Sequence, residues 1–174
     1  MTPLNFSEEN KIVIQAPVLT QHDKTGNEMF SSLSEAQRNK GEVEVAFLTE
    51  DYEYSPSPSE AQLQALQYIL DHQAGLIEAF FDYTKRVLYP TYIEFIGFDE
   101  IDFPEINEPN ELRKALGIAE IYIWPNAKNE MAYVAYSFDF TGDFEHGVIL
   151  IAHQDQILGW EEDLVNDKVL ADLA

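Results

Sequence analysis

Two apolar runs joined by a short glycine-containing segment lie in the last third of the chain, and they limit the possible folds more than any other feature. The runs are Met131–Phe140 and Val148–Ala152, and the polar segment between them contains Gly142 and Gly147. Apolar runs on both sides of a glycine-rich turn are typical of an antiparallel hairpin. A third short run, Gln156–Trp160, follows a polar turn. These runs therefore predict a three-stranded antiparallel meander.

Three further segments have the composition of strands. Lys11–Val18 is rich in β-branched residues and contains a proline, which favours an edge strand. Glu42–Leu48 alternates glutamate with valine, which predicts a half-buried strand whose carboxylates face water. Ile118–Trp124 is mostly apolar and predicts a further strand. Together with the meander, these segments predict a mixed, mostly antiparallel sheet of five or six strands.

A long amphipathic helix is predicted over Pro58–Leu88. From Leu63 onward, apolar residues recur at steps of three and four, which is the period of one helix face. Ser57 provides a start signal, a bend or interruption is expected near Gly75, and Pro90 is expected to end the helix. Because a helix of this length needs a surface to cover its apolar stripe, the predicted fold class is α+β, with the sheet packed against one long helix.

Shorter helices are predicted on both sides of the last four strands. Pro109–Leu116 begins with proline and is followed by Gly117, a common pair of helix boundary signals. Glu161–Leu173 has acidic residues in its first turn, where they favour a helix N-terminus. A weaker pattern at residues 29–38 is also consistent with a short helix.

The length and composition agree with one folded domain over residues 1–174, with residues 1–10 as a loose lead-in and a Pro/Ser boundary at residues 55–59. The sequence contains no cysteine, which excludes disulfides and thiolate metal sites. It shows neither a signal-peptide pattern nor an apolar run of about 18 residues, so we expect a cytoplasmic protein with no membrane partner.

The charge is strongly negative, with 32 acidic and 10 basic residues and a net charge of −22. Acidic residues outnumber basic ones in each third of the chain, so the excess is not confined to a tail. Such a field repels nucleic-acid phosphates and accelerates encounter with basic proteins. The charge therefore argues against a nucleic-acid partner and supports a basic protein partner. Solubility alone is the alternative explanation of the same charge.

Residues 91–108 combine aromatic side chains with clustered carboxylates. Asp99, Glu100 and Asp102 are the kind of oxygen ligands that calcium prefers. Their spacing does not match a calcium-binding EF-hand loop, and the required glycine is missing. The segment is therefore interpreted as a solvated acidic loop, and Glu105 is added to its candidate partner-binding residues.

The polar segment of the meander is the second candidate region. Asp139, Asp143, Glu145 and His146 could supply ligands for a divalent ion, and His146 could act as a general base oriented by Glu145. Nothing beside them provides a nucleophile or an oxyanion hole, and acidic turns are common for conformational reasons alone. We therefore predict no catalytic, cofactor or metal site. The partner-binding candidates are Asp99, Glu100, Asp102, Glu105, Asp143, Glu145 and His146.

The block Leu112–Trp160 resembles a family of small bacterial domains of unknown function. The resemblance rests on Phe138-Asp139, on Glu145-His146-Gly147, and on the strands around them. Related domains resemble immunity proteins of polymorphic toxin systems. The resemblance and the charge together suggest a non-enzymatic acidic protein-binding domain, an immunity-type inhibitor of a basic bacterial toxin. The alternatives are a metal-dependent enzyme that uses the Glu145-His146 loop and a housekeeping interaction module.

Overall fold

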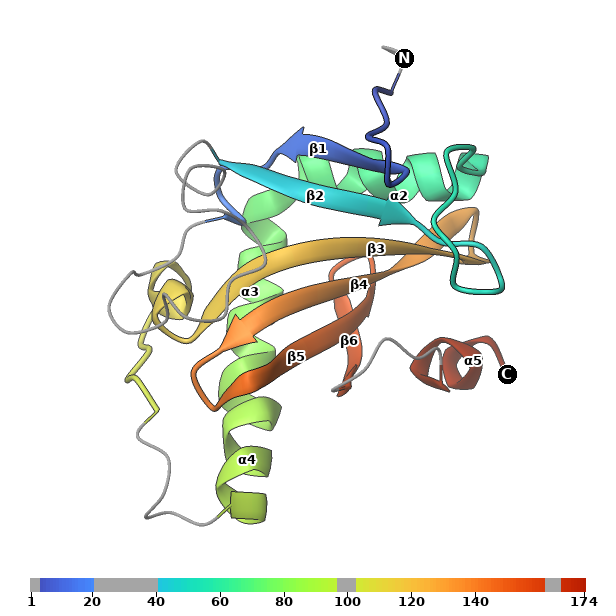
Figure 1. The fold of residues 1–174 in the computed structure, drawn as a ribbon. Coiled ribbons are helices and arrows are strands. Elements are labelled where there is room, and N and C mark those ends of the chain that lie inside the picture. The colour runs from blue at the N-terminus through green and yellow to red at the C-terminus, as the bar shows by residue number, and fades with distance from the viewer. Residues whose placement is uncertain (1–3, 21–40, 97–102, 162–166) are drawn as a thin grey trace.

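The computed structural model describes residues 4–20, 41–96, 103–161 and 167–174 (Figure 1). In these residues six strands form one sheet in the order β1-β2-β3-β4-β5-β6. Neighbouring strands are antiparallel except for β2 and β3, which are parallel, so the predicted mixed and mostly antiparallel sheet is confirmed. The strands are β1 Lys11–Gln15, β2 Glu42–Phe47, β3 Leu116–Lys128, β4 Met131–Phe140, β5 Asp143–His153 and β6 Gln156–Glu161.

Strand β3 is longer than the predicted segment Ile118–Trp124. It continues through Pro125 because the pairing with β4 is irregular between Ile123 and Ala127. A proline has no N–H to donate, and a bulge is one of the few places where a sheet tolerates it. The turn to β4 lies at residues 129–130, where both φ angles are positive as in a type I′ hairpin turn.

The prediction of one continuous helix over Pro58–Leu88 is wrong. Helix α2, Glu60–Asp71, begins with a capping box in which the Ser59 hydroxyl accepts a hydrogen bond from the Gln62 N–H. The chain leaves helical geometry at His72, which has φ −122° and ψ 24°. Helix α3, Gln73–Tyr83, then runs in a new direction (Figure 1), so the interruption expected near Gly75 lies three residues earlier, at His72.

The prediction that Pro90 ends the helix is also wrong. After α3 the chain forms a π-helical turn, η1 Thr84–Leu88, and continues directly into α4 Tyr89–Ile96. The Tyr89 N–H bonds to the Thr84 carbonyl, five residues back. In a regular α-helix the proline ring collides with the carbonyl four residues back, and the wider π turn provides room for it.

The remaining helices are shorter than predicted. The segment predicted as Pro109–Leu116 forms the 3₁₀ helix η2 Pro109–Lys114, because Leu116 already belongs to β3. Helix α5 is Asp167–Leu173, and Glu161, which was predicted to start it, is the last residue of β6. The helix predicted at residues 29–38 lies outside the described residues. None of the helices in the described ranges is long and apolar enough to cross a membrane.

Helices α2, α3 and α4 lie along one face of the sheet, and α5 lies on the opposite face (Figure 1). The main core forms between the sheet and α2 to α4, where the ring of Phe80 meets Tyr136 and Phe138 edge-on at 4.9 and 5.2 Å between centroids. A smaller apolar cluster on the other face contains Trp124, Tyr133 and, from α5, Val169. Helix α5 therefore covers part of a sheet face that α2 to α4 leave open.

Replacing Gln62 with leucine is expected to lower the free energy of unfolding by about 2 kcal/mol, the cost of leaving a buried hydrogen-bonding group unpaired. The Gln62 side-chain amide is buried and donates hydrogen bonds of 2.9 Å to the carbonyls of both Leu48 and Ile123. Urea denaturation measures the effect. Gln67→Leu on the exposed side of α2 is the control, and an equal change in both variants would contradict the role given to Gln62.

Candidate functional site

The β4–β5 hairpin brings two of the predicted partner-binding residues into contact. The Asp143 carboxylate accepts a hydrogen bond of 3.0 Å from the backbone N–H of His146. The same carboxylate lies 3.3 Å from the imidazole Nδ1, and the imidazole is exposed. Sequence reasoning paired His146 with Glu145, but the structure gives it Asp143 as a partner. The Glu145 side chain lies outside the part of the chain that the structure describes.

The polar segment between the two apolar runs of the meander mostly forms a strand. Strand β5 already begins at Asp143, and the turn consists of residues 141–142 alone. Gly142 permits this tight turn: a Cβ atom there would lie 2.5 Å from the ring of Phe140 and 2.6 Å from that of Phe103. The hairpin tip is therefore packed against aromatic rings, which fixes the position of the Asp143–His146 pair.

The acidic segment before η2 reaches the same end of the molecule. The ring of Phe103 stacks on Tyr89 at 4.3 Å between centroids and lies 5.9 Å from Phe140. Burial raises the pKa of the Tyr89 hydroxyl well above its ordinary value. Glu105 follows two residues later and is exposed. Glu105 is thus brought to the same end of the sheet as Asp143 and His146, whereas Asp99, Glu100 and Asp102 lie outside the described residues.

His153 and His72, the other histidines of the described residues, have structural contacts. His153, at the opposite end of β5 from His146, is buried, and its Nε2 lies 2.9 Å from the Lys128 carbonyl and 3.2 Å from that of Met131. It therefore ties the β3–β4 turn to β5. His72 is exposed and stacks on Tyr68. Within the described residues no group of three or more His, Asp or Glu side chains is placed to hold a metal ion.

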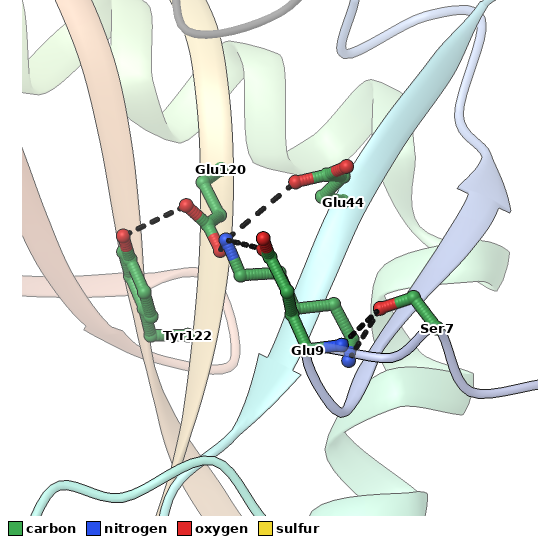
Figure 2. A network of polar contacts seen from close by, with 6 residues as sticks. Ser7, Glu9, Glu44, Glu120 and Tyr122 are labelled. Atoms are coloured by element: carbon green, nitrogen blue, oxygen red, sulfur yellow. Dashed lines mark hydrogen bonds and ion pairs between the residues drawn. The ribbon is translucent and has the colours of Figure 1, made fainter.

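A buried ion pair links the edge strand β1 to β3, and sequence reasoning missed it. The Lys11 ammonium lies 2.8 Å from Glu120, and the Tyr122 hydroxyl donates a hydrogen bond of 2.9 Å to the other oxygen of that carboxylate. Figure 2 shows Glu44 and Glu120 directed toward the same point, and the Lys11 ammonium lies 3.6 Å from Glu44. The Glu9 carboxylate lies 3.9 Å from the same ammonium group. The sequence signal was a glutamate inside an otherwise apolar strand.

The charges in this network shift the pKa values of its members. Burial lowers the pKa of Lys11, but the hydrogen bond and negative charge of Glu120 outweigh it and leave the pKa above its ordinary value. Burial and then the charge of Glu120 raise the pKa of the Tyr122 hydroxyl. Lys11 is therefore charged and Tyr122 protonated at neutral pH. Both are in the forms that donate to the Glu120 carboxylate.

A second polar network attaches α5 to the sheet. The Asp172 carboxylate accepts hydrogen bonds from the Tyr133 hydroxyl at 2.8 Å and from the Lys128 ammonium at 3.0 Å. Lys128 also donates to the Asp172 carbonyl. Because Val169 is the buried residue of this short helix, the Asp172 contacts form a large part of its attachment.

Acidification is expected to release α5 locally. The hydrogen bonds from Tyr133 and Lys128 hold the pKa of Asp172 below its ordinary value. A carboxyl group with a lowered folded-state pKa stabilises the fold above its unfolded pKa, about 3.9, and this contribution is lost as the pH falls through the folded value. Side-chain NMR signals of Val169 and Tyr133 should therefore shift together below about pH 4.

The matching variant for this prediction is Asp172→Ala. Its Val169 and Tyr133 signals are expected to resemble those of the acidified protein already at pH 7, because the acceptor of both hydrogen bonds is missing. Signals that stay in their native positions in this variant at pH 7 would show that Asp172 does not hold the helix. Glu130→Ala, at an exposed carboxylate of the β3–β4 turn, is the control and is expected to leave both signals unchanged.

Two depressions adjoin α3. The smaller has a volume of about 230 Å³, and its largely apolar lining includes Ile77, Leu112 and Phe138. The larger, about 600 Å³, is shallow and open, and crosses α3 from Pro109 to the β5–β6 turn. Neither is lined by Asp143 or His146. The Asp143–His146 pair therefore lies on an exposed hairpin outside both depressions.

Comparison with known proteins complements this geometry. No curated protein matches the chain, and no solved structure matches it. A family model matches residues 23–161, which comprise most of the chain and include strands β2 to β6. The chain therefore belongs to the family described as a domain of unknown function (DUF6985).

Proposed function

We propose that this protein is a non-enzymatic acidic protein-binding domain that acts as an immunity-type inhibitor of a basic bacterial toxin. The observation that carries the proposal is the net charge of −22. Five of the seven Lys and Arg side chains in the described residues already lie within 4 Å of the chain's own carboxylates. These are Lys11, Arg86, Lys114, Lys128 and Lys168. The excess of carboxylates remains available to attract a cationic partner.

The mechanism is electrostatic steering followed by docking. The negative field accelerates the encounter with a basic protein, and carboxylates then pair with Lys and Arg side chains while aromatic side chains are buried. The hairpin end of the sheet is the candidate surface, because Asp143, His146 and Glu105 lie there in front of stacked aromatic rings. Asp99, Glu100, Asp102 and Glu145 are the other candidate residues of this surface.

Two measurements test the proposal. Co-expression with the product of a toxin gene adjacent to this gene should restore growth of cells that the toxin alone kills. The affinity between the two purified proteins should fall by about tenfold or more between 50 and 300 mM NaCl, because exposed charge pairs are screened by salt. Absence of rescue, together with binding that does not change with salt, would contradict the proposal.

The metal-dependent enzyme is a separate candidate, and the close approach of Asp143 to His146 is the observation that favours it. Metal analysis of the purified protein distinguishes it from the binding domain. A metal enzyme would carry a stoichiometric ion, or its melting temperature would rise with calcium, zinc or manganese. A housekeeping interaction module, by contrast, would bind its partner without any adjacent toxin gene.

A further inference from the structure

The sheet face opposite α2 to α4 carries a row of directly paired residues that crosses all six strands. Pairing places Glu44 of β2 opposite Val13 of β1 and, on the other side, opposite Glu120 of β3. The row continues from Glu120 to Ser137 of β4, and then through Ile149 and Glu161. Two glutamates are therefore direct neighbours on adjacent strands, an arrangement that destabilises a sheet unless a cation lies between them.

Lys11 supplies that cation for only part of the negative charge. Its ammonium is within hydrogen-bonding distance of Glu120 at 2.8 Å, but it lies 3.6 Å from Glu44 and 3.9 Å from Glu9. Hydrogen bonds of an ammonium to a carboxylate are shorter than these two distances, and each carboxylate offers about four acceptor positions. Glu44 and Glu9 therefore retain the capacity to bind further cations. This surface already holds one ammonium ion, that of its own lysine.

Some described side chains on the β1 and β2 part of this face are exposed or partly exposed. Helix α5 packs toward the other edge, where it contacts β6 and bonds to Lys128. Val13 is 51% exposed, although it is an aliphatic residue in a strand. Glu42 and Glu44 are partly exposed on the same face. An exposed apolar side chain beside carboxylates is a suitable surface for a partner that carries both apolar and cationic groups.

We propose that the outer face of β1 and β2, with Glu9, Glu42, Glu44 and Val13 as its contact residues, docks a protein surface that presents clustered Lys or Arg side chains. Charge complementarity identifies the occupant, because three glutamates, Glu9, Glu44 and Glu120, surround one lysine there, and Glu42 adds a fourth carboxylate farther along β2. The face adjoins the hairpin end, since β2 and β3 begin where β4 ends and β5 starts. This inference rests on the proposed function and assigns it a second, larger surface.

The probe is cytochrome c, a basic globular protein with a lysine-rich surface. Its binding to the full chain is measured by calorimetry at 50 mM NaCl, and its contact surface by amide NMR shifts of the labelled chain. Glu42→Gln/Glu44→Gln removes two charges from the face. Asp71→Asn/Glu78→Gln removes two exposed charges from the helix layer on the opposite side and is the matched control.

The face variant is expected to weaken binding about fivefold and the control less than about twofold, since exposed charge pairs each contribute a modest free energy. Shifted amides should concentrate in β1 and β2 of the unmodified chain, a measurement that requires no variant to fold. Equal weakening by both variants, with shifts spread over the whole surface, would overturn this inference and leave the proposed function standing. Absence of binding at 50 mM NaCl would overturn both.

Discussion

Replacing Lys11 with methionine is expected to lower the free energy of unfolding by about 3 kcal/mol, because removal of one partner leaves the other charge buried and unpaired. The side chains of Lys11 and Glu120 are 14% and 11% exposed, so water cannot easily replace the lost contact. Without the ammonium, Glu120 would also directly face Glu44 on the neighbouring strand. Methionine keeps much of the apolar length of lysine, so the change mainly reports the charge. Urea denaturation at pH 7 measures it.

Two further variants make this prediction specific. Lys11→Met/Glu120→Gln should recover part of the loss, because a neutral amide removes the buried charge and can still accept the hydrogen bond from Tyr122. Lys114→Met breaks a more exposed ion pair with Glu111 and should change stability by less than about 1 kcal/mol. A loss in Lys11→Met no larger than that in Lys114→Met would mean that the buried pair contributes little.

Replacing Gly147 with alanine is expected to lower the free energy of unfolding by about 3 kcal/mol, the sum of left-handed backbone strain and overpacking. Gly147 has φ +69°, and a Cβ atom there would collide with the carbonyl oxygen of Phe138 on β4. The residue lies where the β4–β5 pairing shifts register, between Phe138 and Phe140. Its substitution should therefore also displace the hairpin that carries Asp143 and His146. Thermal denaturation and amide NMR measure the two effects.

The matched control is Gly75→Ala. Gly75 lies in the first turn of α3, its φ is not positive, and a Cβ atom there meets no heavy atom within 4 Å. Alanine is expected to stabilise the protein by about 0.5–1 kcal/mol through its higher helix propensity and its smaller loss of chain entropy. If the two alanine variants had the same stability, the conformational requirement assigned to Gly147 would be wrong.

The two polar networks each attach an element that lies outside the family match. Residues 23–161 exclude β1, which supplies Lys11 to Glu120, and α5, which supplies Asp172 to Lys128 and Tyr133. Both elements pair or pack at the margins of the sheet formed by β2 to β6. In each network an ion pair therefore joins a terminal element of the chain to the matched region.

Patterns that depend on neighbouring residues were predicted well. The bounds of β4 match the apolar run Met131–Phe140, and the alternation of glutamate with valine correctly placed the carboxylates of β2 away from the core. A capping signal before α2 was also predicted, but the cap is Ser59 and not Ser57, so the helix begins two residues later than expected. These features are local because side-chain periodicity and capping depend on residues only a few positions apart.

The sequence by itself determined the α+β class, the number and mostly antiparallel pairing of the strands, and the surplus of carboxylates. Only the tertiary structure decided that the helix divides at His72 and continues through Pro90. It also decided that the partner of His146 is Asp143 and not Glu145. The position of Lys11 between glutamates of two other strands was likewise visible only in the structure. Helix continuity at a proline depends on hydrogen-bond register, and contacts between distant residues depend on strand pairing. Neither is encoded in the spacing of neighbouring residues.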